Sequence, residues 1–269
     1  MPEKKKPTAI LLTRLTAGSC YVAGQFALSE TFDLVAIVIE DRQYGQRQLL
    51  VRKIRRLWKL DGVLGVSKLL FSLPYLYWHD TKMVRHEEKL LLDGEKPTFP
   101  ADVNLHSFSS LNDIECGKFL SANCPDFIVV LGTRILKRAT YGNSSVATIN
   151  VHTGITPEYR GSKSEFWALF NDEPEKIGVT VHMIDDGIDT GKVLGRRKIH
   201  VESKDDEITL RVKNLKESVS LVEAVIRDWW QGDHTVINTA GSRSDFYSTP
   251  TAWQYMKLHR SLRKRRRAK

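Results

Sequence analysis

Short, continuous apolar runs alternate along this chain with longer segments of mixed polarity. Runs of strand length cover residues 8–13, 34–40, 103–108, 126–132, 146–152, 178–184 and 192–201. Segments long enough for helices lie between them, at 18–30, 46–92, 111–123, 164–172 and 206–232. A run that is apolar throughout is typical of a strand buried on both faces. The pattern therefore predicts an α/β fold, with a mostly parallel sheet and helices on both of its faces.

Two segments depart from this alternation and define the domain organisation that we predict. Residues 1–241 form one domain, into which residues 46–92 are inserted as a basic helical segment. Residues 242–269 lose the periodicity and form a short carboxyl-terminal appendage with a basic tail, "RKRRRAK". A chain of 269 residues suits one large domain with such an appendage.

The inserted segment combines apolar and basic residues. Leu50, Ile54, Leu57 and Trp58 recur at helical spacing beside several Arg and Lys residues. A basic amphipathic helix with a Trp can lie on an anionic membrane, or it can pack over the body of the protein. A second apolar stretch, residues 63–78, favours packing, because two such segments joined by a short turn can cover each other. A weak contact of residues 46–78 with a membrane surface stays open.

Composition narrows the class of protein. Hydrophobic residues make up 41% of the chain, which is enough for a folded core, and the formal net charge is +9. A basic chain favours anionic partners such as phosphorylated substrates. The three cysteines, Cys20, Cys116 and Cys124, lack the spacing of a metal site and are odd in number. They indicate reduced thiols in a cytoplasmic protein, and we expect no bound metal.

Polar residues interrupt one apolar run at its end. In "ATINVHTGITPEYRG", residues 147–161, Asn150 and His152 are two positions apart, so a strand would point both side chains to the same face. Ligands of parallel α/β sheets bind at the carboxyl ends of the strands. The two side chains are therefore expected at the mouth of a site.

An acidic loop follows the next strand along the chain, in "MIDDGIDTG", residues 183–191. An Asn amide can donate to an oxyanion, a His can donate or carry a proton, and an Asp can orient the imidazole. No Ser or Cys nucleophile lies beside them, so an acceptor would attack its substrate directly. The alternative is that Asn150 caps a turn, His152 is a core histidine and the acidic loop is solvated.

Two linked motifs add to this interpretation. The pattern N-x-H-x-G-x-x-P-x-Y-R-G begins at Asn150, and G-V-T-V-H-x-x-D-x-G-I-D-T-G begins at Gly178. Together they resemble the folate-dependent formyltransferase family, over roughly residues 125–232. The family includes glycinamide ribonucleotide formyltransferases, methionyl-tRNA formyltransferases and sugar N-formyltransferases. The resemblance implies a Rossmann-like sheet, a catalytic domain at residues 1–241 and 10-formyltetrahydrofolate as formyl donor.

The resemblance also implies which residues do the chemistry. Asn150, His152 and Asp189 form the catalytic trio, with Asp189 chosen because it is the Asp of G-I-D-T-G. Asn150 and His152 would steady the oxyanion, while Asp189 orients His152 and helps to move the proton of the amine. The expected donor-binding residues are Arg134, Ile135, Leu136, Asp185, Asp186 and Gly187.

The acceptor is less constrained. The first strand is followed by "TRLTAGSCYVAGQ", which lacks the glycine-rich phosphate loop of glycinamide ribonucleotide formyltransferases. Too few residues follow the long helix for the β-barrel of methionyl-tRNA formyltransferases, and nucleic acid is not expected as a partner. A primary amine on a nucleotide-linked amino sugar is the acceptor that we expect, contacted by Tyr159, Arg160 and Lys163.

Other activities remain as alternatives. Formylation of glycinamide ribonucleotide or of methionyl-tRNA would use the same trio, as would a hydrolase that deformylates the folate. A basic binding module could retain the fold without turnover. A homodimer is compatible with the sequence, which specifies no oligomeric state.

Overall fold

The computed structural model describes the backbone of residues 6–40 and 46–267. Within these ranges it describes all side chains except those of residues 46–61, 64–66, 68, 69, 265 and 267. The predicted apolar stripe of Leu50, Ile54, Leu57 and Trp58 therefore lies outside the described side chains.

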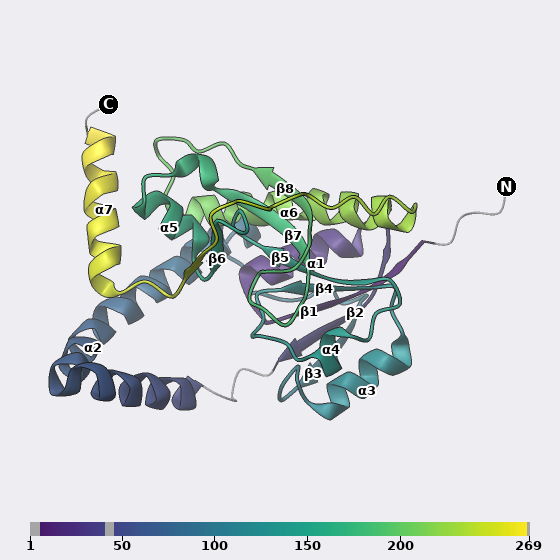
Figure 1. Ribbon diagram of the computed structural model, residues 1–269, viewed down its shortest axis with the longest axis horizontal. Helices are drawn as coiled ribbons and strands as arrows, with labels where there is room; N and C mark the ends of the chain where they lie inside the picture. The colour runs from purple at the N-terminus through teal and green to yellow at the C-terminus, as the bar shows by residue number, and fades with distance from the viewer. Residues whose placement is uncertain (1–5, 41–45, 268–269) are drawn as a thin grey trace.

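Strands and helices alternate along the chain as the apolar runs predict (Figure 1). The strands are β1 (Thr8–Thr13), β2 (Asp33–Glu40), β3 (Asn104–Phe108), β4 (Phe127–Leu131), β5 (Ala147–His152), β6 (Tyr159–Gly161), β7 (Gly178–Met183), β8 (Val193–Lys198) and β9 (Asp245–Tyr247). The helices are α1 (Ala17–Ala27), α2 (Gln46–Leu92), α3 (Ile114–Asn123), α4 (Arg138–Tyr141), α5 (Ser164–Phe170), α6 (Glu207–Trp230) and α7 (Ala252–Arg267), with a 3-10 turn at Pro174–Lys176.

Seven of these strands form one sheet in the order β3-β2-β1-β4-β5-β7-β8. The strands from β3 to β5 are parallel, whereas β7 is antiparallel to both β5 and β8. The predicted mostly parallel α/β fold is confirmed. The chain order reverses between β1 and β4, and ligands of such sheets bind near the carboxyl ends of the strands at this switch point.

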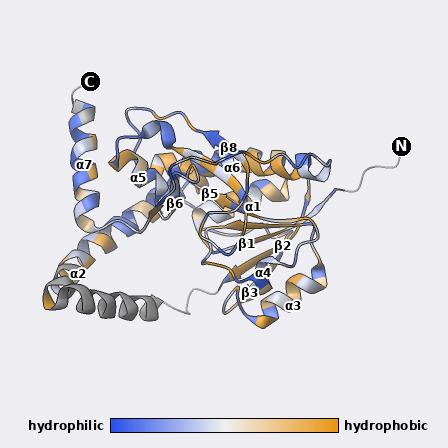
Figure 2. Cartoon of the chain, viewed as in Figure 1, coloured by the Kyte–Doolittle hydropathy of each residue, from blue (hydrophilic) through white to orange (hydrophobic). Residues whose placement is uncertain are grey.

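Two hydrophobic clusters cover the faces of the sheet, whose strands Figure 2 colours as hydrophobic. On one face α1 and α6 pack against alternate strand positions, including Leu11, Val129 and Ile149. On the other face α3 covers the intervening positions, including Ile10 and Ile128. Because successive strand residues point to opposite faces, strands buried on both sides need apolar residues throughout. This is why their sequences read as continuous apolar runs.

The long helix α2 is divided at Gly62, whose backbone torsions (φ 56°, ψ −140°) are not helical. Glycine tolerates this left-handed φ because it has no Cβ. The second half packs against α1, α6 and α7. It also leaves apolar side chains in solvent, among them Phe71 (87% exposed) and Tyr77 (77% exposed). The expectation that residues 63–78 are covered is therefore wrong for this face of the helix.

The carboxyl-terminal residues contain two elements that the sequence pattern does not predict, β9 and α7. The expected loss of periodicity after residue 242 is wrong, because β9 pairs with β6 and α7 packs against α5 and α2. Ala252, Tyr255, Leu258 and Leu262 recur three or four positions apart and are all buried. Basic residues between them obscure this helical spacing in the sequence.

None of the described helices is both long enough and apolar enough to cross a membrane.

Candidate active site

Strand register brings the polar side chains of β5 and β7 together. Asn150 pairs with His182, and His152 pairs with Thr180, across the antiparallel β5–β7 ladder. Directly paired residues point to the same face of a sheet, and so do residues two apart on one strand. Asn150, His152 and His182 therefore share one face at the end of β5.

The loop after β7 brings Asp189 to this face. Asp189 has a left-handed backbone (φ 51°), a conformation that Asp adopts more readily than most residues. Its Oδ2 accepts a hydrogen bond from the backbone N–H of Gly161, at 2.8 Å. Gly191 allows the loop to close, since a Cβ there would lie 1.8 Å from the carbonyl oxygen of Met183. The tight Gly-containing loop thus fixes one carboxylate beside the strand end.

Asp189 is the centre of a polar network. Its Oδ1 accepts from Asn150 Nδ2 at 3.3 Å and lies 3.5 Å from His182 Nε2. Its Oδ2 lies 3.6 Å from His152 Nδ1. The predicted trio of Asn150, His152 and Asp189 is brought together, and His182 joins it.

The carboxyl of Asp189 is held in its charged form. Burial alone would raise its pKa, but the charge of His152, together with the neighbouring His182 and the Gly161 N–H, outweighs burial. The pKa of Asp189 consequently falls to about 2. An anionic oxygen acceptor is therefore present at neutral pH.

Both ring nitrogens of His152 contact other groups of the protein. Its Nε2 donates to the carbonyl oxygen of Tyr159 at 2.7 Å, so Nε2 carries a hydrogen. Ser164 Oγ lies 3.2 Å from the same nitrogen, while Nδ1 faces Asp189. In this arrangement His152 positions Asp189. Its Nε2–H is bonded to the Tyr159 carbonyl oxygen, so the contact with an oxyanion that the sequence suggested stays a prediction.

His182 was not singled out from the sequence. Its Nδ1 donates to the Met183 carbonyl oxygen at 2.8 Å, which leaves Nε2 to accept from Asn150 Nδ2 at 3.1 Å. It is buried, so it orients the amide of Asn150 from behind. The signal that could have revealed it is the histidine of the G-V-T-V-H motif, but only the β5–β7 register shows its partner.

The three residues expected to contact the acceptor differ in how far they are buried and in what they contact. Tyr159 is fully buried, and its hydroxyl donates to Glu173, so we assign its side chain to the core and withdraw it from the acceptor contacts. Arg160 lies along the acidic loop and donates to the Ile188 carbonyl oxygen at 3.1 Å. Lys163 is half-buried, and burial together with the charge of Arg211 lowers its pKa.

A phosphate-binding loop would lie at the start of α1. Backbone N–H groups there are instead bonded to side chains of the protein itself. Thr16 caps the helix by accepting from the Ser19 N–H at 3.1 Å. Glu87 of α2 places a carboxylate oxygen 3.1 Å from the Gly18 N–H, and its other oxygen lies 3.3 Å from Arg211 Nε. The N–H groups of a helix N-terminus attract anions. Here the chain supplies that anion itself.

Comparison with known proteins decides the family. A family model described as formyl transferase matches residues 83–226, which is more than half of the chain. This chain belongs to the formyl transferase family. The matched segment contains all four members of the network around Asp189, so the family assignment and the site geometry concern the same residues.

Two curated formyltransferases illustrate the similarity. The chain is 31% identical over 125 residues to a methionyl-tRNA formyltransferase of Chlorobium chlorochromatii, covering 46% of this chain and 39% of that protein. It is 32% identical over 115 residues to a GDP-perosamine N-formyltransferase of Brucella melitensis, covering 40% of this chain and 42% of that protein. The chain thus matches about two fifths of the length of these relatives.

Solved structures share the fold. A 4-N formyltransferase from Francisella tularensis superposes with a TM-score of 0.54 at 16% identity, over 89% of this chain and 76% of that one. A glycinamide ribonucleotide transformylase from Symbiobacterium toebii gives a TM-score of 0.56 at 15% identity, over 90% and 95% of the two chains. At these identities the likeness concerns the fold alone.

The loop after β4 contains the first three residues expected to bind the formyl donor. Arg134 forms an ion pair with Glu40 at 2.7 Å, so its side chain is held against the end of β2. Leu136 is buried, whereas Ile135 is 65% exposed. Beside them Gly132 borders open space, since a Cβ there would meet nothing within 4 Å. An exposed apolar side chain next to open space suits a flat aromatic ring.

The acidic loop provides the other three expected donor contacts. Asp185 accepts from the Gly187 N–H at 3.0 Å and from Thr190 Oγ1 at 2.7 Å. Asp186 accepts from the hydroxyl of Tyr141 at 2.6 Å. Both carboxylates therefore shape the loop. The backbone of the loop, more than these two side chains, is available to a ligand.

Proposed function

We propose that this chain transfers a formyl group from 10-formyltetrahydrofolate to a primary amine. The observation that carries the proposal is the ionised Asp189 hydrogen-bonded to the amide of Asn150, at the end of β5. The donor would supply an activated formyl carbon. The open space at Gly132 and the exposed Ile135 fit its ring system, and the backbone of residues 134–136 and 185–187 would hold its polar edge.

Asn150 provides the hydrogen-bond donor for the formyl oxygen, which gains negative charge during transfer. Its amide has two hydrogens, directed to His182 Nε2 at 3.1 Å and to Asp189 Oδ1 at 3.3 Å. We infer that the longer bond is exchanged for the bond to the substrate oxygen, while His182 holds the amide in place. A donor of this kind contributes about 3 kcal/mol to lowering the barrier.

Asp189 receives the proton of the attacking amine through the oxygen released by this exchange. It passes this proton to N10 of tetrahydrofolate as the bond between N10 and the formyl carbon breaks. His152 stays beside the other oxygen, Oδ2, and the Gly161 N–H fixes the carboxylate from the same side. Asp189 loses its negative charge when it takes the proton of the amine. The ring of His152 lies beside it during this change of charge. In this mechanism His152 acts through Asp189, not on the oxyanion itself.

A nucleotide-linked amino sugar is the acceptor that we propose. The carboxylate of Glu87 at the start of α1 would repel a phosphate from the position where glycinamide ribonucleotide would bind. The similarity to a GDP-perosamine N-formyltransferase supports the same class of acceptor. Arg160 beside the acidic loop supplies a cation for a substrate phosphate.

A panel of acceptors tests this proposal. The chain is incubated with 10-formyltetrahydrofolate and, in turn, nucleotide-linked amino sugars, glycinamide ribonucleotide and methionyl-tRNA, while release of tetrahydrofolate is measured. We expect release to depend on an amino sugar. Release without any amine would indicate a hydrolase, and absence of folate binding would indicate a non-catalytic binding module. Turnover of glycinamide ribonucleotide alone would contradict the role given to Glu87.

A further inference from the structure

Three helices meet at a buried cluster that contains none of the residues of the candidate active site. His79 of α2, Glu207 of α6 and His259 of α7 converge, with all their ligand atoms within 4.8 Å of one another. Glu207 Oε1 lies 2.8 Å from His259 Nε2 and 3.4 Å from His79 Nε2. The side chains of His79 and Glu207 are only 3% and 4% exposed. Two imidazoles and a carboxylate are the ligand set of many zinc sites.

The spacing of these atoms suits a tetrahedral metal. Zinc binds His nitrogen and carboxylate oxygen at about 2.0–2.2 Å, which places neighbouring ligand atoms about 3.3 Å apart. The two distances to Glu207 Oε1 are close to this value on either side. All three ligand atoms lie within 4.8 Å of one another, so a movement of the side chains that brings the two imidazoles nearer would complete the site.

Two buried atoms in the cluster lack a hydrogen-bond partner among the described residues. They are Glu207 Oε2 and His79 Nδ1. A buried carboxylate oxygen without a partner costs free energy, and a metal that Glu207 binds through both of its oxygens would satisfy it. His79 Nδ1 faces a carboxylate oxygen of Asp80 at 3.7 Å. At zinc sites a carboxylate in this place orients the histidine by accepting from its ring N–H, and Asp80 would have to approach His79 to do so.

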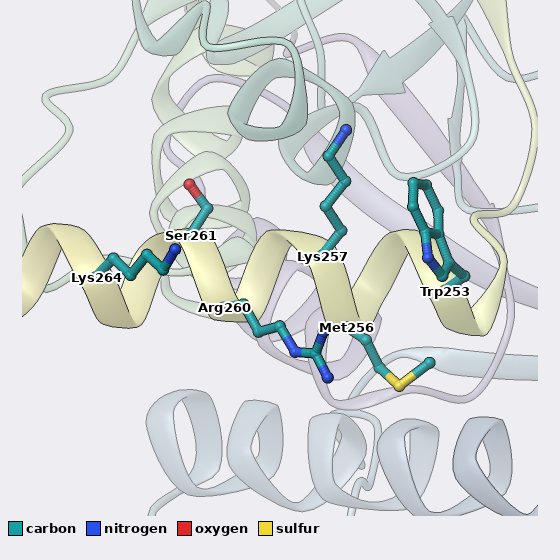
Figure 3. Close-up of a pocket in the computed structure, with 6 residues that line it drawn as sticks. All are labelled: Trp253, Met256, Lys257, Arg260, Ser261 and Lys264. Carbon is teal, nitrogen blue, oxygen red and sulfur yellow. The ribbon is translucent and has the colours of Figure 1, made fainter.

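A cavity of about 450 Å³ lies beside the cluster and leaves room for a fourth ligand. Met256 and Arg260 of α7 line it, and Figure 3 shows both on the side of the helix that faces α2. Lys82 and Arg263 also line the cavity and raise the cost of a divalent cation there, while Asp206 offsets part of this charge. The basic rim favours an anionic fourth ligand, such as hydroxide.

We propose that His79, Glu207 and His259 bind one zinc ion, which fastens α2 and α7 to the start of α6. The three ligands come from three helices and none belongs to the network around Asp189, so the ion would cross-link these helices while solvent fills its fourth position. Without the metal, the same residues form a histidine–glutamate–histidine hydrogen-bonded cluster, which is the competing description.

Metal titration of the full-length chain tests the proposal. The protein is stripped with a chelator, dialysed and titrated with Co²⁺ and then Zn²⁺, while visible absorption and bound metal are measured. We expect one equivalent of Co²⁺ with the absorption bands of a tetrahedral site, displaced by Zn²⁺. A His259→Gln variant should bind at least tenfold more weakly, whereas His200→Gln, at an exposed histidine elsewhere, should bind as the wild type does.

A second readout covers the case in which a variant folds poorly. Zinc should raise the melting temperature of the wild type and of His200→Gln but not that of His259→Gln, and circular dichroism would verify that each variant is folded. Absence of stoichiometric metal from the wild-type protein, or equal affinity in His259→Gln, would overturn the proposal and leave the hydrogen-bonded cluster.

Discussion

Single residues in the candidate active site act through one carboxylate. Asp189 is contacted by Asn150, His152, His182 and the N–H of Gly161, and these contacts fix both its position and its charge. The most informative of them is His182, because it lies behind both Asn150 and Asp189. Its effect on the rate therefore measures how much the positioning of these two side chains matters.

Replacing His182 with Gln should lower kcat about tenfold, corresponding to about 1.4 kcal/mol of barrier. The physical reason is that Asn150 loses the acceptor that holds its amide, while the neighbouring strands keep their backbone pairing. Steady-state kinetics would be compared with those of His200→Gln, which alters an exposed histidine outside the site. An unchanged kcat in His182→Gln, with normal folate binding, would mean that the amide needs no such support.

The sequence determined part of this site and not the rest. Asn150, His152 and Asp189 were predicted from the strand alternation and from the family motifs. The hydrogen bond of His152 to the Tyr159 carbonyl and the burial of Tyr159 could not be predicted, since both depend on how the turn after β5 folds back. The pairing of Glu87 with the Gly18 N–H joins residues 69 positions apart, and no local pattern indicates it.

At the scale of secondary-structure elements, strands were easier to predict than the helix packing outside the sheet. β4 is buried along its whole length, so its continuous apolar run predicts a buried strand directly. In α7 the buried residues alternate with Arg and Lys, and the basic tail obscured a helix that contributes Tyr255 to a core cluster. The contact between α2, α6 and α7 depends on this helix and therefore was not foreseen.

The junction of α2, α6 and α7 should depend on pH through Glu207. Burial raises the pKa of Glu207, but hydrogen bonds from His259 and His79 outweigh it and bring the pKa down from 4.5 to about 2. A lowered pKa in the folded state stabilises the protein above pH 4.5, and this stabilisation is lost as the pH falls toward 2.

Glu207→Gln should accordingly lower the free energy of unfolding by about 3 kcal/mol at pH 7, the usual cost of breaking a buried ion pair. Urea denaturation of both proteins, in the presence of a chelator to exclude metal, should show this difference shrinking as the pH is lowered from 4.5. A difference that stays constant between pH 7 and pH 3 would show that Glu207 contributes nothing through its charge.

At the scale of the whole molecule, α2 and α7 extend away from the sheet (Figure 1). Val63, Leu70, Tyr77 and Val84 of α2 lie seven positions apart in turn and are all exposed, so they form one apolar stripe. Lys82 of α2 and Arg260 and Arg263 of α7 add positive charge where the two helices meet. An apolar stripe beside basic side chains is complementary to an anionic membrane surface.

Vesicle sedimentation tests whether this surface binds lipid. We expect the chain to sediment with vesicles that contain phosphatidylserine, and to do so less at higher salt, because exposed charges are screened. Phe71→Ser, at the most exposed apolar side chain that the structure describes in α2, should reduce the bound fraction about threefold without changing the melting temperature. Leu28→Ser, at an exposed position at the end of α1, is the matched control. Equal binding of the two variants would exclude a contact through α2.

Formyl transfer through the network around Asp189 is the central claim, and single-turnover kinetics test it most directly. The wild type, Asn150→Ala, His152→Ala and Asp189→Asn are each mixed with 10-formyltetrahydrofolate and a nucleotide-linked amino sugar, and folate binding is measured in parallel. Asn tolerates the left-handed backbone at position 189, so the last variant removes the charge with little change of shape. We predict rates at least about a hundredfold lower in all three variants, with folate binding retained. Near-wild-type rates in all three would contradict the account.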